Sequence, residues 1–387
     1  MACNFNKIID RGESNSVKYD LRSAIFGKPD VIPMWVADMD FETPEFIRNA
    51  VIARANHPVY GYTFKPESYY QAIIQWLQQR HGWAVHPDWI SFSPGVVPAL
   101  NLAVLAVTQP NDKVIVQTPV YYPFTSAVKH HQRELLINQL IFSENKYTID
   151  YDLLEQQARE ASLLILCNPH NPVGRAWRRE ELEKVADICI RNKVIVLSDE
   201  IHNDLLLPGY THQVFADLSS EAAQITITAH APSKTFNLAG LSTSSVIISD
   251  DTLRKKFRHT LEGIHIELGN LFGITASIAA FTEGDAWLDA LVTYLSENIR
   301  YATGIINAQL PWVNVVQTEA TYMMWIDFSA SGLSDEELKQ HFIHKAGLGL
   351  SPGYEFGPGG QGFMRINVAC PRSNLEKAFD QLVASFA

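Results

Sequence analysis

Cysteine is scarce in this chain, and no cysteines are spaced as metal ligands or as a disulfide framework. The four cysteines lie far apart and form no Cys-x-x-Cys pair: Cys3, Cys167, Cys189 and Cys370. Zinc ribbons and disulfide-rich secreted domains need closely spaced cysteines. The histidines also lack metal-ligand spacing with carboxylates or thiols. We therefore expect free thiols in a reducing compartment, the cytoplasm, and no metal site.

Long apolar segments and an excess of positive charge are also missing. No stretch approaches the ~18 consecutive apolar residues of a transmembrane helix, and the first twenty residues are charged throughout with no apolar signal core. The formal net charge is −11, whereas a nucleic-acid or anionic-membrane surface needs a basic patch. We expect neither a membrane nor a nucleic-acid partner.

Three common catalytic signatures are absent as well. The chain contains no Gly-x-Ser-x-Gly elbow, no Walker motif and no His-Glu-x-x-His pair. These motifs mark serine hydrolases, P-loop nucleotide-binding proteins and zinc proteases, respectively. The chemistry must therefore be sought in other residues.

What the sequence does contain is the pattern of a large α/β domain. The chain has 387 residues, of which 47% are hydrophobic and 19% charged, enough for one large and one smaller domain. Amphipathic helical patterns alternate with near-continuous apolar runs, which are typical of parallel sheets covered on both faces. The runs are 113–117, 163–167, 194–198, 225–228 and 245–249.

The last part of the chain has a different character. Residues 321–328 and 363–369 read as strands, and a helix follows in which Ser373 and Glu376 have the spacing of a capping box. We expect a smaller C-terminal α+β domain. The division we predict is an N-terminal arm that joins the small domain (1–45), a large α/β domain (46–290) and the small domain (291–387).

Polar side chains follow four of the predicted strands at the point where each strand ends. Tyr121 follows the first run, Asn171 the second, Asp199 the third and Lys234 the fourth. Each has an ordinary explanation taken alone: packing, a turn, a helix cap and a solvated surface charge. Because ligands of open parallel sheets bind beyond the carboxyl ends of the strands, the four together indicate a site on one rim.

At this point the sequence resembles the fold-type I pyridoxal-phosphate enzymes, the class I/II aminotransferase family. The motifs that carry the resemblance are Asn-Pro-Val-Gly (171–174), Ser-Asp-Glu (198–200) and Ser-Lys (233–234). More narrowly, the chain is similar to the MalY/PatB-type C–S lyases, the cystathionine β-lyase branch, on the segments 33–41, 60–63, 168–177, 198–205, 231–241, 351–357 and 362–372. The resemblance implies a pyridoxal 5′-phosphate cofactor, a mainly parallel seven-stranded sheet in the large domain, and a homodimer with shared active sites.

The resemblance also assigns roles at the cofactor ring. Lys234 would hold the cofactor covalently and serve as the proton-transfer base, for which a nearby cation or a dry pocket must lower its pKa. Asp199 would pair with the pyridine nitrogen and make the ring an electron sink. Asn171 would donate to the phenolic oxygen, and Tyr121 would stack on the ring. His202 replaces the tyrosine that aminotransferases carry at that position, which favours the lyase branch.

The cofactor phosphate needs hydrogen-bond donors and positive potential. Gly95, Val96 and Val97 open a predicted helix whose free N–H groups suit a dianion. The resemblance adds the Ser233 hydroxyl and Tyr62 of the partner subunit. Many aminotransferases carry an arginine where this chain has Ser242, so the sequence accounts less well for neutralisation of the phosphate.

The predicted substrate site is built around Arg365, which lies inside a strand and is costly to bury without an anion. Its ordinary explanation is a structural salt bridge, whereas the resemblance makes it the bidentate clamp of the substrate carboxylate. Ala37, Tyr121, Asn171 and Tyr354 would line the same pocket. No second arginine for a side-chain carboxylate is evident, so aspartate is a poor candidate substrate.

Three functions remain open on the sequence. The first is a C–S β-lyase that cleaves cystathionine, cysteine or cysteine S-conjugates to pyruvate, ammonia and a thiol. The second is an aminotransferase, which uses the same residues up to the carbanion. The third is a regulatory protein-binding role on the same scaffold, either alone or beside catalysis, although a non-catalytic protein would not need Lys234, Asp199 and Arg365 together.

Overall fold

The apolar runs between residues 65 and 250 form the central strands of a seven-stranded sheet. The computed structural model describes residues 3–387, and its sheet has the strand order β2-β10-β9-β8-β7-β3-β4. The pairs from β9 through β4 are parallel, whereas β10 is antiparallel to both of its neighbours. The predicted fold, an α/β sheet of seven mainly parallel strands, is confirmed. The strands are β2 (Ile90–Ser93), β3 (Lys113–Val116), β4 (Glu134–Ile137), β7 (Ala161–Cys167), β8 (Ile195–Asp199), β9 (Thr226–His230) and β10 (Ser244–Ile247).

Two details of the sheet differ from the sequence-based expectation. The run 245–249 reads as a strand of a parallel sheet, but β10 is antiparallel, because an apolar run does not encode direction. The connection from β9 to β10 contains only short turns of helix, α10 (Pro232–Thr235) and Ala239–Leu241, and no long crossover helix of the kind that joins parallel strands. The edge strands β2 and β4 carry serine or partly exposed residues and were not among the predicted runs.

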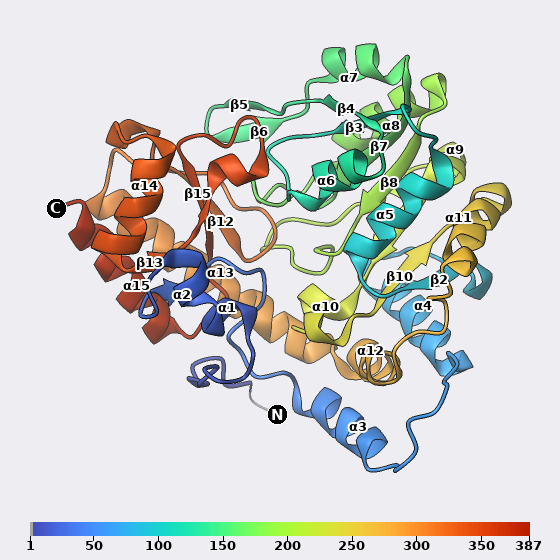
Figure 1. The fold of residues 1–387 in the computed structure, drawn as a ribbon, viewed down its shortest axis with the longest axis horizontal. Helices are drawn as coiled ribbons and strands as arrows, with labels where there is room; N and C mark the ends of the chain where they lie inside the picture. The colour runs from blue at the N-terminus through green and yellow to red at the C-terminus, as the bar shows by residue number, and fades with distance from the viewer. Residues whose placement is uncertain (1–2) are drawn as a thin grey trace.

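Helices cover both faces of the sheet (Figure 1). Successive side chains of a strand point to opposite faces, and β3 shows this directly. Val114 and Val116 pack in one cluster with α5 (Val96–Val107), whereas Ile115 packs in another with α8 (Arg179–Asn192). The other helices of these two layers are α6 (Pro123–His130), α7 (Tyr151–Ala158), α9 (Ser220–Ile225) and α11 (Asp251–Gly263).

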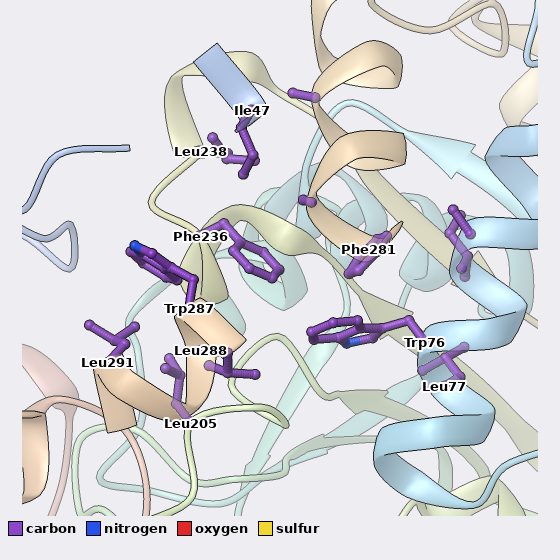
Figure 2. Close-up of a cluster of buried hydrophobic side chains, with 14 of the residues drawn as sticks. Ile47, Trp76, Leu77, Leu205, Phe236, Leu238, Phe281, Trp287, Leu288 and Leu291 are labelled. Atoms are coloured by element: carbon purple, nitrogen blue, oxygen red, sulfur yellow. The ribbon is translucent and has the colours of Figure 1, made fainter. Parts of the chain in front are cut away.

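A third cluster, rich in aromatic residues, lies against the segment that follows β9. Figure 2 shows Trp76, Phe236, Phe281 and Trp287 facing one another within it. The ring centroids of Trp76 and Phe236 are 5.5 Å apart, and those of Phe236 and Trp287 are 5.7 Å apart. The helices that supply this cluster are α3 (Glu45–Ala55), α4 (Glu67–His81), α12 (Leu271–Glu283) and α13 (Asp285–Gln309). Because Phe236 directly follows α10, the cluster anchors one side of that helix.

The C-terminal part forms a separate four-stranded antiparallel sheet with helices around it. Figure 1 shows the N-terminal helices α1 (Val17–Asp20) and α2 (Arg22–Phe26), in blue, beside these red C-terminal elements. The strand β1 (Ile32–Pro33) pairs with β13 (Leu348–Gly349). The other elements are β11 (Asn314–Val315), β12 (Met323–Asp327), β14 (Ser351–Pro352), β15 (Phe363–Asn367), α14 (Asp335–His341) and α15 (Arg372–Ser385), with the hairpin β5 (Ile141–Ser143) and β6 (Lys146–Thr148) elsewhere.

The predicted capping box at the last helix is wrong. α15 begins at Arg372 with Pro371 as its N-cap and no side-chain cap. The backbone N–H groups of Asn374 and Leu375 donate to the Pro371 carbonyl. Ser373 therefore lies inside the first turn, where its hydroxyl cannot cap the helix.

The predicted domain boundary falls within a continuous helix. α13 spans 25 residues, from Asp285 to Gln309, so the proposed division at 290/291 lies near its beginning. Its second half packs on the C-terminal sheet, through Ile299, Ala302 and Ile306. The division into an arm, a large and a small domain remains a prediction. Among residues 3–387, no helix has both the length and the apolar character of a membrane span.

Candidate active site

The carboxyl ends of three parallel strands lie level with one another and bring the predicted polar residues together. Cys167 of β7 is paired with Asp199 of β8, and Asp199 with Ala229 of β9. The chain leaves each strand at this edge, and a cavity of about 200 Å³ lies there. The predicted site residues that line this cavity are Ala37, Gly95, Val96, Val97, Tyr121, Asn171, Asp199, His202, Ser233 and Lys234.

Lys234 points toward the loop that contains Ala37. It lies on α10, and its Nζ donates a hydrogen bond of 2.6 Å to the Ala37 carbonyl oxygen. Burial, together with the positive charge of Arg365, lowers the pKa of Lys234 to about 8, although Asp38 and Asp199 act in the opposite direction. A larger share of the amine is therefore unprotonated near neutral pH than for an ordinary lysine.

Asp199 and His202 face the same cavity, and burial shifts their pKa values in opposite directions. Burial raises the pKa of Asp199 to about 7, while a hydrogen bond of 3.1 Å from the Ile201 N–H favours its ionised form. A cationic nitrogen in the cavity would stabilise the carboxylate further. Burial also lowers the pKa of His202 to about 3, so this imidazole is neutral. Asp199 is thus suited to pair with a cationic group, and His202 is suited to serve as a neutral hydrogen-bonding group.

The beginning of α5 supplies the donor groups for an anion. Gly95 is its N-cap and has a φ of 139°, a conformation that only glycine adopts without strain. Val96 and Val97 follow as the first helical residues, whose N–H groups have no intrahelical partner. Three hydroxyl residues also line the cavity: Ser233, Ser242 and Thr243. Hydroxyl and N–H donors are thus present in the cavity, to which many aminotransferases contribute an arginine at the position of Ser242.

These residues fit pyridoxal phosphate. The cavity offers a lysine amine of lowered pKa for the aldehyde, a carboxylate for the ring nitrogen and a helix N-terminus with hydroxyl groups for the phosphate. The apolar side chains of Val96, Phe124 and Ile201 complete its lining. A planar aromatic ring with one anionic substituent matches this mixture of donors and apolar surface.

Arg365 lies next to the cavity but does not line it. Its guanidinium donates to Asn171 Oδ1 at 3.1 Å, to the Trp35 carbonyl at 2.7 Å and to Ser351 Oγ at 3.3 Å, and it lies 4.7 Å from the centre of the Phe356 ring. All three acceptors are uncharged, so these contacts do not form the structural salt bridge that was the ordinary explanation. Burial lowers the pKa of Arg365 to about 10. A buried cation with only neutral partners is suited to bind an anion.

Two other predicted residues also lie outside the cavity lining. Tyr354 is in the turn Gly353–Phe356, and its hydroxyl accepts a hydrogen bond of 3.4 Å from Lys339. Tyr62 is fully exposed in the single chain. The contribution of Tyr62 to a site in a partner subunit stays a prediction.

The structure adds residues that sequence reasoning missed. Cys167 lines the cavity directly before Asn168, and Asp38 raises the pKa of Lys234 from the loop beyond Ala37. Tyr322 donates a hydrogen bond of 3.0 Å to the same Ala37 carbonyl that Lys234 contacts. The first two stand beside motif residues and could have been noticed, whereas Tyr322, which directly precedes β12, is far from Ala37 in the sequence and leaves no local signal.

An α/β sheet with a lysine, an aspartate and an asparagine at the ends of adjacent strands is the arrangement of a pyridoxal-phosphate enzyme, and comparison with known proteins agrees. The family model for aminotransferase class I and II matches residues 29–382, and the chain belongs to this family. It is 45% identical to cystathionine beta-lyase PatB of Bacillus subtilis (strain 168), over 99% of this chain and 100% of PatB. It is 31% identical to protein MalY of Escherichia coli (strain K12), over 98% and 97% of the two chains.

A solved structure gives the same result for the fold. Cystalysin from Treponema denticola, which contains a pyridoxal 5′-phosphate cofactor, is 36% identical and superimposes with a TM-score of 0.97 over 100% of this chain and 99% of its own. The predicted resemblance to the class I/II aminotransferase family and to its MalY/PatB-type branch is confirmed.

Proposed function

We propose that this chain is a pyridoxal-phosphate-dependent C–S β-lyase that acts on cystathionine, cysteine or a cysteine S-conjugate. The reaction consumes one water, and its products are pyruvate, ammonia and the thiol (hydrogen sulfide from cysteine) that leaves from the β-carbon. The observation that carries the proposal is the group around the cavity: Lys234 with its lowered pKa, Asp199 at the strand end, and Arg365 bonded to Asn171.

The cofactor and the enzyme class are the best supported parts. PatB is named a cystathionine β-lyase, and cystalysin contains pyridoxal 5′-phosphate. The similarity covers nearly all of both chains, and the predicted cofactor and the predicted class of carbon–sulfur lyase are confirmed at this level. The choice among sulfur amino acids is the proposal.

The residues divide the work of removing the α-proton and expelling the thiolate from the β-carbon, which together form one α,β-elimination. When bound, the cofactor supplies the electron sink that stabilises negative charge at the substrate α-carbon. Arg365 binds the substrate carboxylate, and its bond to Asn171 fixes the guanidinium relative to the cavity. Lys234 Nζ removes the α-proton, for which an amine with a pKa near the operating pH is suited. The Asp199 carboxylate would pair with the protonated ring nitrogen of the cofactor.

The lining also restricts the substrate. No arginine lines the cavity within the described residues, and Arg365 is the adjacent one. Aspartate would need a second cation for its side-chain carboxylate, which lies beside the reacting carbon atoms, whereas the distal carboxylate of cystathionine is accompanied by its own ammonium group. This favours the lyase over an aspartate aminotransferase, which remains the alternative because the same residues serve both reactions.

We further propose a homodimer with shared active sites. Exposed large apolar side chains gather along the N-terminal third of the chain: Ile8, Ile52, Val59, Tyr60, Tyr62 and Phe64. Ile8 and Ile52 also line a surface hollow of about 930 Å³ that does not contain the lysine or the aspartate of the site. Exposed apolar side chains that lie together on a surface are a common sign of a protein interface. In such a dimer, Tyr62 of the partner subunit completes the cofactor site, and sedimentation of the holoenzyme as a monomer with full activity would contradict the proposal.

The proposed location is the cytoplasm, in keeping with four cysteines that are all free in the described structure. The third function, a regulatory protein-binding role, has no support of its own in the geometry of the site.

The experiment that tests the proposed reaction is pyruvate release from L-cystathionine, with added pyridoxal phosphate and no keto-acid acceptor. Sustained turnover supports the lyase, because a transaminase stops after one half-reaction when no acceptor is present. A single change of the cofactor spectrum without pyruvate would instead identify an aminotransferase. The matched blank is the Lys234→Ala variant, which should release no pyruvate above background.

A further inference from the structure

A second buried carboxylate, Asp204, lies close to the site but does not line the cavity. Its side chain is fully buried and accepts hydrogen bonds from three groups. The donors are Trp76 Nε1 at 3.1 and 3.2 Å, His81 Nε2 at 2.9 Å and Thr235 Oγ1 at 2.8 Å. These donors come from α4 and α10, so Asp204 joins two helices that are far apart in the sequence.

Asp204 is held in its ionised form by these partners. Burial alone would raise its pKa, but the hydrogen bonds from His81 and Thr235 and the nearby imidazoles lower it to about 2. Hydrogen bonds to a charged acceptor are stronger than those between neutral groups. The bond between Thr235 and Asp204 is therefore a firm attachment at a buried position.

This attachment falls on the residue after Lys234. α10 has only four residues, and so short a helix has little stability of its own. Its orientation must come from its contacts. Phe236 enters the aromatic cluster beside Trp76 (Figure 2), and Thr235 reaches Asp204. On the opposite side, Ser233 and Lys234 face the cavity.

Asp204 also belongs to the segment at the end of β8 that carries two residues of the cavity. Asp199 and His202 line the cavity, and the chain then turns so that Asp204 points away from it toward α4. One short segment therefore holds two residues of the cavity and, five residues beyond Asp199, the anchor of α10. Displacement of Asp204 would move Lys234 relative to Asp199.

We propose that Asp204 is a positioning residue, which through the Thr235 hydroxyl fixes α10 so that Lys234 and Ser233 face the cofactor. The proposal rests on the proposed role of Lys234. It assigns to Asp204 no contact with substrate or cofactor.

The test compares isosteric variants of Thr235. Thr235→Val keeps the shape and removes the hydroxyl, Thr235→Ser keeps the hydroxyl, and Thr226→Val is the matched control. The Thr226 hydroxyl is also buried and donates to the Ala222 carbonyl at 2.6 Å, away from the cavity. For Thr235→Val we expect kcat to fall by about 10-fold or more with KM changed by less than about 3-fold, because misplacing a catalytic group by a fraction of an ångström has effects of this size. We also expect the cofactor to dissociate faster on dialysis and its absorbance band to shift. Thr235→Ser should recover most of each effect.

Asp204→Asn completes a double-mutant cycle. If Asp204 acts through Thr235, the double variant should lose no more kcat than Asp204→Asn alone. Independent, multiplicative losses would overturn the proposal, and so would Thr235→Val behaving like Thr226→Val in kcat, cofactor release and spectrum. The Lys234→Ala variant separates the two levels. If it is inactive while Thr235→Val is normal, only the positioning role fails; if it retains full activity, the proposed function itself fails.

Discussion

Replacing Arg365 by methionine removes the proposed carboxylate clamp while filling much of the same volume. The guanidinium has three neutral acceptors and no ion pair among its hydrogen bonds. Loss of a buried, charge-assisted contact to the substrate costs about 2–4 kcal/mol. At 1.4 kcal/mol per factor of ten, KM for cystathionine should rise by about 30- to 700-fold.

The stability of the same variant should change little, and this separates the clamp from a structural role. Burial disfavours the charged form of Arg365, which is why its pKa is lowered to about 10. Methionine relieves this cost of burying a charge, which offsets the loss of the three hydrogen bonds to neutral acceptors. We expect the free energy of unfolding of Arg365→Met to stay within about 1 kcal/mol of the unsubstituted protein.

The assay is steady-state pyruvate release, with denaturant unfolding measured in parallel. The matched control is Arg258→Met. Arg258 lies on α11 and donates to the Asp88 carbonyl at 2.7 Å and to Ser91 Oγ at 3.2 Å, so it should leave KM unchanged. A KM for Arg365→Met within about twofold of the unsubstituted enzyme, far below the 30-fold floor set by a charged contact, would refute the reasoning and place the carboxylate elsewhere.

Three other predictions concern the cofactor site. Lys234→Ala should abolish turnover and the absorbance band of the bound cofactor, and an active variant would end the proposal. The pKa of Lys234 is lowered to about 8, and only the unprotonated amine attacks the aldehyde. The rate at which the cofactor-free enzyme captures pyridoxal phosphate covalently should therefore rise with pH and level off above about 8, whereas with an ordinary lysine it would level off only above about 10. Stopped-flow absorbance distinguishes the two pH profiles. Gly95 has a φ of 139°, so Gly95→Ala should lower the free energy of unfolding by about 1–3 kcal/mol and weaken cofactor binding. The control is Gly304→Ala at an exposed helical position, which should stabilise the protein by about 0.5–1 kcal/mol. Equal unfolding midpoints of the two variants would contradict the prediction.

The sequence predicts the central strands well because a buried parallel strand is apolar along its whole length. It does not predict the direction of β10, since direction depends on the connection and not on the strand itself. Edge strand β4 has an exposed first residue and partly buried ones after it, so its pattern is weaker. The capping box at Ser373 fails because Pro371 takes the N-cap position first.

The candidate site shows the same division between local and distant information. Asn171, Asp199 and Lys234 each stand in a short motif at a strand end, and the sheet brings them together. The uncharged surroundings of Arg365 depend on Trp35 and Asn171, which are far from it in the sequence. The bond from Thr235 to Asp204 is likewise invisible in either motif. Contacts between distant segments have no signature in a single sequence. The partners of Arg365 and of Thr235 could therefore not be predicted from the sequence.

The pairing of β1 with β13 has a consequence for how the protein is made. The loop that carries Ala37 and supplies the Trp35 carbonyl to Arg365 is held by Gly349, through a bond from Met34 N, and by Asn367, whose side chain donates to Val36 and Asp38. These partners are translated more than 300 residues later. At about 5–20 residues per second, the N-terminal loop waits for roughly 15–60 s before its partners exist. The cavity can therefore close only after Asn367 has been made, and a ribosome-bound chain that stops before Leu348 should not retain the cofactor.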